Sequence, residues 1–439
     1  MTLEDYLREH AQNRPDQCAI VCGSQQVSYG QLWNAILERA KQLKECGVKQ
    51  HRPYVFRASQ DADFVVTYCA THLLNAIAVP LEHAASDEVF NNIKSEVEAC
   101  QFADDICDTL FTTGTSGQAK GVMLSQTCLA ACAENFITEM NFHPELVFII
   151  SGPLSHIASL FKIHPILTVG GTLCVLDGLR DMNAFFQVFE LPYKHFATFL
   201  VPSSIRMLLQ FSAEQLSAVS HLVDFIETGA APIYSADMER LSNVLPNSRL
   251  YNTYGGTEIG CVCTYQFNDG KYLEGCIGRP MRNASIHLED GRIVVSGKTI
   301  MSGYVSNPEL TASILRNGSI YTSDLGTIDS EGRLHLRGRV DDLINVGGFK
   351  VAPTEIEEVA LLHPDIKDCI CIPVPHIITG NALKLLVVLK EGRTFDKRSI
   401  AMCLKQRLEA YKIPSLYESV ETINRTFNGK LDRKSYLTT

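Results

Sequence analysis

The sequence predicts a layered α/β protein. We expect a large amino-terminal domain of mixed sheets flanked by helices, with a small β-barrel-like subdomain, followed by a small α+β domain. Strand-like and helix-like runs alternate over residues 1–108 and 122–300, which is typical of layered α/β architectures. The chain has 439 residues, enough for two or more domains. After residue 350, a helix, two apolar strands and a second helix indicate a compact α+β unit.

Hydrophobic spacing places the elements of the first part of the chain. Apolar residues between Gln31 and Cys46 recur at helical spacing, and Gly47 ends the pattern. The elements expected before residue 112 are helix 3–11, a hairpin of 19–22 with 26–29, helix 31–46, a helix running into a strand over 64–79, and a strand end at 108–111.

The rest of the chain continues the alternation. Residues 122–125 and the alanine- and cysteine-rich run after them are expected to begin a helix. Strands are expected at 148–156 with a polar tip, 173–176, 224–232 with a bend, 250–254, 291–297 and 301–304, then a helix from Pro353, strands 369–374 and 385–389, and a helix over 398–411.

Bulk properties limit the classes of function. The net charge is −10 and no basic run is present, so sequence-independent nucleic-acid binding is not expected. No apolar run approaches the ~20 residues of a membrane helix, and we expect no signal peptide because the first residues have neither a basic leader nor an apolar core. The 15 cysteines form no Cys-x-x-Cys pair, so we expect reduced thiols in a cytoplasmic protein and no zinc site built from cysteines.

A glycine-rich stretch, Thr112–Gly121, is the feature around which the chain is organised. It reads Thr-Thr-Gly-Thr-Ser-Gly-Gln-Ala-Lys-Gly. Glycines expose backbone N–H groups, successive N–H groups form a concave anion site, and a lysine adds a positive charge. The spacing is not that of a Walker A loop. An isolated loop of this composition is usually a polar turn, but its fixed lysine and the motifs downstream favour a polyphosphate site.

This stretch resembles the phosphate loop of the adenylate-forming superfamily, which includes acyl-CoA synthetases, firefly luciferase and the adenylation domains of nonribosomal peptide synthetases. The resemblance implies that ATP phosphates are bound by Thr112, Thr113, Gly114, Thr115, Ser116, Gly117 and Lys120. The family usually has proline before the lysine, where this chain has Ala119. The segment before the loop is shorter than is usual in the family, so we expect a trimmed amino-terminal subdomain.

Leu250–Glu258 contains the second strong motif, a complete match to the family's Tyr-Gly-x-Thr-Glu. A hydroxyl and a carboxylate suit a magnesium ion bound to phosphates. By resemblance, Tyr254 stacks on the base, Thr257 and Glu258 are catalytic, and Glu258 with Thr113 holds Mg²⁺. The resemblance also implies that Gly255 leaves room for an acid larger than acetate.

Two other segments are expected to line the same site. Gly229, Ala230 and Ala231 form a small-residue bend, and small side chains let a flat ring lie against the backbone. In the family such a bend packs beside adenine. By resemblance, His156 belongs to the catalytic residues and lines the acid pocket and the thiol channel; an isolated histidine at a strand end is more often structural.

The resemblance continues to the end of the chain. It implies that Asp324 and Arg339 bind the ribose, that Asp341 is a hinge, and that Gly348 lines the tunnel for the thiol. Lys430, after Gly429, matches the lysine that promotes adenylation. The expected domains are therefore 1–339, carrying the ATP and acid sites, and 340–439, a mobile lid.

We therefore expect an ATP-dependent, AMP-forming acid–thiol ligase that uses Mg²⁺, with CoA as the thiol and a medium- or long-chain or aryl acid as substrate. An acyl carrier protein as acceptor, a catalytically degenerate nucleotide-binding protein and an ADP-forming kinase are alternatives. Arg206 is a candidate for binding a second carboxylate, although a surface arginine is the simpler interpretation. The oligomeric state is open, with a homodimer as one possibility.

Overall fold

The computed structural model describes residues 1–113, 119–179, 181–425 and 431–436, and the chain divides into two compact units. Unit 1 consists of Met1–Leu273, Ile277–His287 and Val294–Tyr321. Unit 2 consists of Glu274–Cys276, Leu288–Ile293 and the chain from Thr322 onward. The predicted α/β class is confirmed. The domain boundary expected between residues 339 and 340 remains a prediction.

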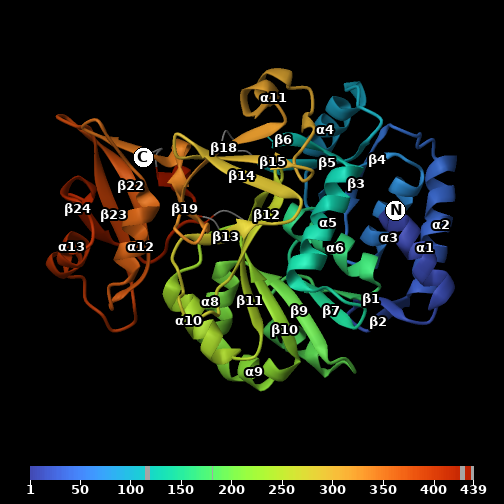
Figure 1. Cartoon of the computed structure of the whole chain (residues 1–439), viewed down its shortest axis with the longest axis horizontal. Helices are drawn as coiled ribbons and strands as arrows, with labels where there is room; N and C mark the ends of the chain where they lie inside the picture. The colour runs from blue at the N-terminus through green and yellow to red at the C-terminus, as the bar shows by residue number, and fades with distance from the viewer. Residues whose placement is uncertain (114–118, 180, 426–430, 437–439) are drawn as a thin grey trace. The chain divides into compact units, whose positions relative to one another are not determined.

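A mainly parallel sheet forms the centre of unit 1. Its strands lie in the order β12-β11-β10-β9-β7-β8-β1-β2, and those from β11 to β1 are parallel (Figure 1). The bounds are β1 Cys18–Cys22, β2 Gln25–Ser28, β7 Leu146–Ile150, β8 Thr172–Val175, β9 His195–Leu200, β10 Val223–Thr228, β11 Arg249–Gly256 and β12 Gly260–Gln266. Every residue of β7 is buried, as expected for a parallel strand covered on both faces.

Helices alternate with these strands. Those of unit 1 are α1 Leu3–Asn13, α2 Tyr29–Glu45, α3 Ala62–Leu73, α4 Asp87–Ala99, α5 Gln126–Met140, α6 Ile157–Val169, α7 Met182–Gln187, α8 Pro202–Phe211, α9 Ala213–Ala218, α10 Ser235–Val244 and α11 Pro308–Ile314. The helices predicted at 3–11 and 31–46 are α1 and α2, and each starts with a capping box, made by Thr2 and Ser28. The predicted hairpin is β1–β2.

A second sheet carries the glycine-rich stretch, with strand order β16-β6-β5-β4-β3. The bounds are β3 Pro53–Ala58, β4 Ile77–Glu82, β5 Ile106–Thr113, β6 Ala119–Ser125 and β16 Gly303–Tyr304. The prediction that 122–125 begins a helix was wrong. These residues belong to β6, which pairs antiparallel with β5, and the helix α5 begins only after Ser125 caps it. Val122 and Leu124 are buried in this sheet, so its packing overrode the local pattern.

A buried charged network fixes the amino end of β5. Asp108 is fully buried and accepts hydrogen bonds from His72 Nε2 at 2.7 Å and from the Tyr68 hydroxyl at 2.7 Å. His72 Nδ1 lies 3.3 Å from Glu4 Oε1, so the imidazole bridges two carboxylates. The Tyr68 hydroxyl also lies 2.9 Å from His164 Nε2. Four elements, α1, α3, α6 and β5, are therefore joined by this network, with α3 providing both partners of Asp108.

The pKa values in this network follow from burial and charge. Burial alone would lower the pKa of His72, but the charge of Asp108 and the hydrogen bonds to Asp108 and Glu4 raise it to about 10. Burial lowers the pKa of His164 to about 4, and the charged His72 adds to that effect. His72 is therefore an imidazolium at neutral pH and His164 is neutral.

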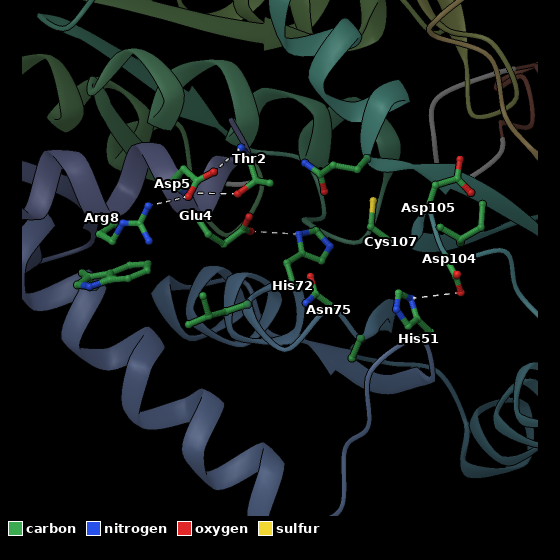
Figure 2. Close-up of a pocket in the computed structure, with 15 residues that line it drawn as sticks. Thr2, Glu4, Asp5, Arg8, His51, His72, Asn75, Asp104, Asp105 and Cys107 are labelled. Atoms are coloured by element: carbon green, nitrogen blue, oxygen red, sulfur yellow. Dashed lines mark hydrogen bonds and ion pairs between the residues drawn. The ribbon is translucent and has the colours of Figure 1, made fainter.

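A cavity of about 210 Å³ lies beside this network, with Glu4, His72 and Cys107 in its wall (Figure 2). Trp33, the only tryptophan of the chain, also lines it. The cavity is at the amino end of β5, whereas the glycine-rich loop follows the carboxyl end. The eight residues of β5 span roughly 25 Å, so the cavity is remote from the expected phosphate site.

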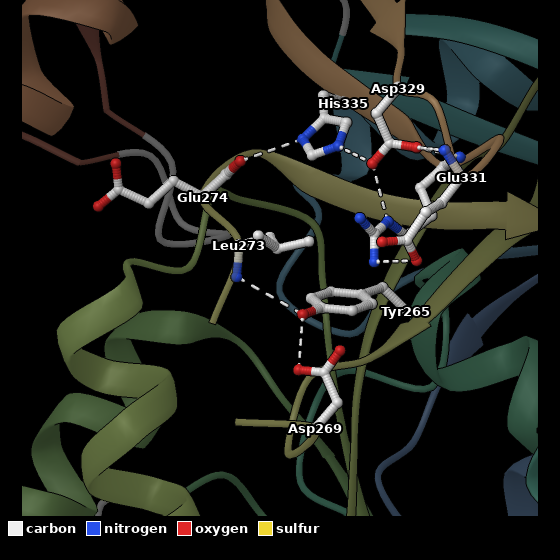
Figure 3. A network of polar contacts seen from close by, with 8 residues as sticks. Tyr265, Asp269, Leu273, Glu274, Asp329, Glu331 and His335 are labelled. Carbon is white, nitrogen blue, oxygen red and sulfur yellow. Dashed lines mark hydrogen bonds and ion pairs between the residues drawn. The ribbon is translucent and has the colours of Figure 1, made fainter. Parts of the chain in front are cut away.

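Unit 2 contains a hairpin closed by one aspartate. β18 (Ser319–Ile328) pairs antiparallel with β19 (Leu334–Arg339). In the turn between them, Asp329 accepts hydrogen bonds from Arg333 Nε at 2.8 Å and lies 3.0 Å from His335 Nε2 (Figure 3). The hydrogen bond to His335 and those to the turn lower the pKa of Asp329 well below its usual range. The same figure shows a separate contact within unit 1, in which the Tyr265 hydroxyl donates to Asp269 at 3.0 Å.

The last hundred residues form the α+β body that the sequence predicts. Their elements are β20 Ile344–Val346, β21 Phe349–Val351, α12 Pro353–Leu361, β22 Ile366–His376, β23 Gly380–Leu389, α13 Lys397–Lys405 and β24 Leu416–Ser419. The remaining strands, which follow β12 along the chain, are β13 Cys276–Pro280, β14 Ala284–Glu289, β15 Arg292–Gly297 and β17 Leu315–Arg316. Ile356, Val387 and Leu404 belong to a single apolar core on which α12 and α13 pack.

Two expectations about the whole chain concern cysteines and membranes. All fifteen cysteines are free thiols, and most are buried. In the described parts of the chain, none of the helices is both long and apolar enough to cross a bilayer.

Changing His72 to Gln tests the network through the pH dependence of stability. The folded-state pKa of about 10 lies above the unfolded value of about 6.5, so the stabilisation is complete below pH 6.5 and is lost as pH rises toward 10. We expect the variant to lose about 3–5 kcal/mol at pH 6, because Asp108 is left buried without a counter-charge. The deficit should shrink between pH 7 and 10. Urea unfolding followed by Trp33 fluorescence measures it.

The matched control is His287→Gln, which changes an exposed histidine of β14. Its deficit should be near zero at every pH. A deficit for His72→Gln that stays constant from pH 6 to 10 would contradict a charged His72.

Candidate functional site

The loop expected to bind phosphates joins β5 to β6. The register places Thr112 opposite Lys120 and Thr113 opposite Ala119. Four of the residues predicted to bind phosphate lie outside the described residues: Gly114, Thr115, Ser116 and Gly117. The antiparallel pairing still brings the lysine back beside the hydroxyl residues at the mouth of this hairpin.

Close packing explains the glycine that follows the lysine. A Cβ on Gly121 would lie 2.8 Å from the Phe111 ring and 2.9 Å from Val305 Cγ2. The backbone N–H of Val305 also donates to the Gly121 carbonyl at 2.8 Å. A side chain at position 121 would therefore push apart β5, β6 and the segment after β16.

Tyr304, on β16, connects the loop to the predicted magnesium ligand. Its hydroxyl donates to Glu258 Oε1 at 2.8 Å, and its ring centroid lies 5.8 Å from Lys120 Nζ. The backbone N–H of Met301 donates to the Glu258 carbonyl at 2.8 Å. Burial raises the pKa of Tyr304, and the charge of Glu258 raises it further, so the hydroxyl remains a donor at neutral pH. One buried tyrosine thus contacts Glu258 through its hydroxyl and Lys120 through its ring.

Sequence reasoning missed Tyr304 as a site residue. Ser302-Gly303-Tyr304 was predicted only as part of a strand, and no local pattern relates it to Glu258, 46 residues earlier. The contact depends on β16 pairing with β6, in which Tyr304 lies opposite Val122. This pairing could not be predicted from the sequence, because the local pattern assigns residues 122–125 of β6 to the start of a helix.

The second motif lies at the end of β11, where the structure changes one interpretation. Tyr254 and Thr257 are both buried. A Cβ on Gly255 would lie 2.4 Å from the Gly260 carbonyl oxygen and 2.9 Å from Cys261 Cα. Gly255 is therefore required by the close approach of β12 at an irregular register, and it no longer supports the idea of an enlarged acid pocket.

The small-residue bend follows β10 as expected, and its glycine is also required by packing. A Cβ on Gly229 would lie 2.8 Å from the Thr253 carbonyl oxygen on β11. Ala230 has φ +65°, a left-handed conformation that costs energy for a residue other than glycine. Ala231 completes the bend. The segment is thus held in an unusual backbone shape against the strand that carries Tyr254.

A buried ion pair supports this bend, and sequence reasoning missed it. Lys162 Nζ, on α6, lies 3.0 Å from Glu227 Oε2, and Thr253 donates to Glu227 Oε1 at 2.9 Å. Both charged side chains are almost completely buried. Burial raises the pKa of Glu227, while Lys162 opposes that rise. The ammonium also lies 3.6 Å from the centroid of the Phe136 ring, a favourable cation–π position.

His156 is the residue that immediately precedes α6, and its side chain is partly exposed. Its Nε2 lies 2.7 Å from Glu82 Oε1, at the end of β4. Both side chains are partly exposed. Its predicted role in lining the acid pocket remains a prediction. Arg206 pairs with Asp237 at 3.1 Å, so a second carboxylate would have to compete with an existing partner.

Unit 2 brings together the two predicted ribose ligands. Asp324 and Arg339 are opposite each other in the β18–β19 ladder, and Arg339 Nε lies 3.5 Å from Asp324 Oδ1. Thr322 Oγ1 accepts from the Asp324 backbone N–H at 3.1 Å. The hairpin closed by Asp329 therefore presents a carboxylate and a guanidinium side by side, a pair that suits a vicinal diol.

The predicted thiol-tunnel glycine lies in a tight turn of unit 2. Gly347 and Gly348 connect β20 to β21 with φ of +58° and +94°, values that favour glycine. The Gly348 N–H donates to Asn345 Oδ1 at 2.9 Å. Asp341, the predicted hinge, is exposed in a short 3₁₀ turn.

Lys430 lies outside the described residues, but its flanking residues are anchored. Arg425 and Leu431 form a β-bridge on either side of the gap. Arg425 binds Asp368 through its Nη2 at 2.7 and 2.9 Å. Arg433 Nη2 donates to Glu357 Oε2 at 2.7 Å, and burial raises the pKa of Glu357 despite this partner.

The donor set can hold the magnesium ion that the second motif implies. Glu258 supplies one carboxylate, with Oε1 already oriented by Tyr304. Mg²⁺ in nucleotide sites is commonly held by one or two carboxylates, substrate phosphates and water. One oriented glutamate is compatible with such a site, and the expected Thr113 ligand remains a prediction.

Family profiles match most of the chain. A profile of AMP-binding enzymes matches residues 7–101 and 86–305, and a profile of the AMP-binding enzyme C-terminal domain matches 355–430. The second match begins after the β20–β21 turn and ends at Lys430.

Named proteins and solved structures resemble the chain over long stretches. A feruloyl-CoA synthase from Amycolatopsis is 30% identical over 346 residues, covering 75% of this chain and 68% of that protein. A long-chain-fatty-acid–CoA ligase from Escherichia coli O6:H1 is 29% identical over 356 residues, covering 75% and 61%. ATP-bound MatB from Rhodopseudomonas palustris has the same fold, with a TM-score of 0.89, 24% identity, and coverage of 100% of this chain and 98% of that one.

Changing Tyr304 to Phe tests the link between Glu258 and the loop. The variant keeps the ring beside Lys120 and removes the donor to the carboxylate. We expect about tenfold weaker binding of Mg²⁺–ATP, because a hydrogen bond to a charged group contributes about 1.5 kcal/mol or more. Isothermal titration at saturating Mg²⁺ measures this affinity.

The matched control is Tyr265→Phe, which removes a hydroxyl bonded to Asp269 instead. It should bind Mg²⁺–ATP as the unchanged protein does. Equal affinities for both variants and the unchanged protein would refute the role given to Tyr304.

Proposed function

The chain belongs to the AMP-binding enzyme family, and on that premise we propose that it is an ATP-dependent acid–thiol ligase. In the first half-reaction a carboxylic acid and ATP give acyl-AMP and pyrophosphate. In the second, a thiol attacks the acyl group and releases AMP. CoA is the proposed thiol.

One observation carries the proposal. Lys120, the proposed phosphate-binding cation, and Glu258, the proposed magnesium ligand, both contact the buried Tyr304 within unit 1. Attack on the α-phosphate concentrates negative charge, and that charge must be balanced by groups fixed in advance. Residues of β6, of β16 and of the turn between β11 and β12 supply such a fixed arrangement.

Different residues of the chain are proposed to bind different parts of ATP and the acid during adenylation. Lys120 and the Thr112–Gly117 turn are proposed to bind the β- and γ-phosphates. Mg²⁺, held by Glu258, would neutralise phosphate charge. Tyr254 and the Gly229–Ala231 bend are proposed to hold the adenine, and Lys430 to bridge the carboxylate and the α-phosphate.

Unit 2 is proposed to serve both half-reactions. Asp324 and Arg339 would hold the ribose hydroxyls, since their paired side chains offer both acceptors and donors. For thioester formation, residues 340–439 would rotate about Asp341, withdrawing Lys430 and presenting the Gly348 turn to the thiol. The tight conformation of Gly347–Gly348, which leaves the backbone exposed, supports a turn that a slender thiol arm can pass.

The acid is proposed to be larger than acetate, an aryl or longer-chain carboxylate. Support comes from the named relatives, which are a feruloyl-CoA synthase and a long-chain-fatty-acid–CoA ligase. A cytoplasmic location is proposed as well, because fifteen free thiols suit a reducing compartment. An acyl carrier protein as acceptor and a protein that binds nucleotide without catalysis are the alternatives.

The test is pyrophosphate release over carboxylic acids of increasing length, including aryl and dicarboxylic acids, with and without CoA. We expect one class of acid to give AMP and pyrophosphate, and CoA to accelerate turnover to a thioester. The matched control is Lys430→Ala, which should lose pyrophosphate release and still form thioester from a preformed acyl-adenylate.

Each other outcome selects an alternative. Pyrophosphate release that CoA leaves unchanged would indicate a carrier protein as acceptor. ADP as the product would indicate a kinase. Mg²⁺–ATP binding without pyrophosphate release for any acid would indicate a degenerate nucleotide-binding protein.

A further inference from the structure

A cluster of two histidines and one aspartate lies on the large sheet of unit 1 and has no role in the proposed reaction. His143 precedes β7, His195 is the first residue of β9, and Asp224 is the second residue of β10. His143 Nε2 lies 3.1 Å from Asp224 Oδ2, and His195 Nδ1 lies 3.0 Å from Asp224 Oδ1. The two imidazole rings are nearly perpendicular, with centroids 5.1 Å apart.

The three side chains have the spacing of metal ligands. One ligand atom from each lies within 4.8 Å of the others. In a tetrahedral zinc site with bonds of about 2.1 Å, neighbouring ligand atoms are roughly 3.4 Å apart. The nitrogen–oxygen separations of 3.0 and 3.1 Å, which end on the two different oxygens of the Asp224 carboxylate, are within a few tenths of an ångström of that value. Small side-chain movements would open the cluster enough to admit an ion.

A neighbouring carboxylate favours the same assignment. Glu145 Oε2 lies 3.8 Å from His195 Nε2, the ring nitrogen that faces away from Asp224. Metal-binding histidines usually donate their other N–H to a carboxylate or carbonyl, which fixes the tautomer and strengthens the ligand. His195 is therefore placed to bind through Nδ1, and a small movement of the exposed Glu145 side chain would let it accept a hydrogen bond from Nε2–H.

The position of the cluster separates it from the nucleotide site. β7, β9 and β10 are parallel, and all three ligands lie at their amino ends. Gly229 and Tyr254 lie at the carboxyl ends of β10 and β11. Six residues of strand, about 20 Å, separate the two edges. An ion here would join three adjacent strands without touching the ATP residues.

We propose that His143, His195 and Asp224 form a binding site for one divalent metal ion of the zinc class, which stabilises unit 1. Two imidazole nitrogens and one carboxylate suit zinc far better than magnesium or calcium, which prefer oxygen ligands. The side chains of His143, His195 and Asp224 are 24%, 40% and 21% exposed, so an ion can enter from solvent and water can complete its coordination.

The competing explanation is a hydrogen-bonded cluster in which Asp224 only links two histidines. Both explanations predict lower stability when Asp224 is changed. Only a metal site predicts that the unchanged chain binds one more ion than the ligand variants. It also predicts a Co²⁺ absorption spectrum typical of nitrogen and oxygen ligands, and a gain in stability that depends on added metal.

The experiment titrates the full-length chain, stripped with a chelator under reducing conditions, with Co²⁺ as a spectroscopic probe and with Zn²⁺. We expect one ion bound through nitrogen and oxygen ligands, without a thiolate charge-transfer band, and a Tm raised by about 2 °C or more at saturating Zn²⁺. Asp224→Asn, of nearly the same shape, should bind this ion at least about 100-fold more weakly. His195→Gln should behave likewise, and the exposed His221→Gln should not.

Three results would overturn the proposal. The unchanged chain and both ligand variants could bind equal numbers of ions. The Co²⁺ spectrum could be dominated by thiolate ligation, or added Zn²⁺ could leave the Tm unchanged. If Asp224→Asn does not fold, His195→Gln and the Co²⁺ spectrum of the unchanged chain still decide the question.

Discussion

The ion pair between Asp108 and His72 is the interaction on which the first part of the site depends. Asp108 is completely buried, and a buried carboxylate must find both a counter-charge and hydrogen bonds. His72 and Tyr68, both on α3, supply them, and this fixes β5 relative to that helix. β5 then aligns β6, β6 aligns β16, and β16 places Tyr304 against Glu258. A buried charge thereby positions groups that lie far along the same sheet.

A second buried ion pair, Lys162–Glu227, fixes the position of the bend after β10 in the same way. It sits next to Thr253 and the strained Ala230, where backbone shape decides whether a flat ring can lie against the chain. Buried ion pairs rarely add stability compared with apolar residues of the same size, but removing one partner is strongly destabilising. We infer that both pairs contribute specificity of geometry more than net stability. In unit 2, Glu357–Arg433 and Asp368–Arg425 hold the chain on both sides of the segment that contains Lys430.

The sequence predicted local features well and long-range contacts poorly. The helices over 3–11 and 31–46 and the β1–β2 hairpin follow from local spacing, and all are present. The juxtaposition of Asp324 and Arg339 followed from the family resemblance. Tyr304, Lys162 and Glu227 could not be predicted, because their partners are brought near only by strand pairing and helix packing. Gly255 was misread for a related reason, since its neighbour, Gly260, lies on an adjacent strand.

The central claim is that the carboxylate of the acid attacks the α-phosphate of ATP, and oxygen tracing tests it most directly. With the preferred acid labelled with ¹⁸O in both carboxyl oxygens, the account predicts one heavy oxygen in AMP and one in the thioester, because the thiol breaks the bond between the acyl carbon and the bridging oxygen. Mass spectrometry of AMP and of the thioester measures the number of ¹⁸O atoms in each. Heavy oxygen in inorganic phosphate, with ADP as the nucleotide, would show an acyl phosphate and contradict the account.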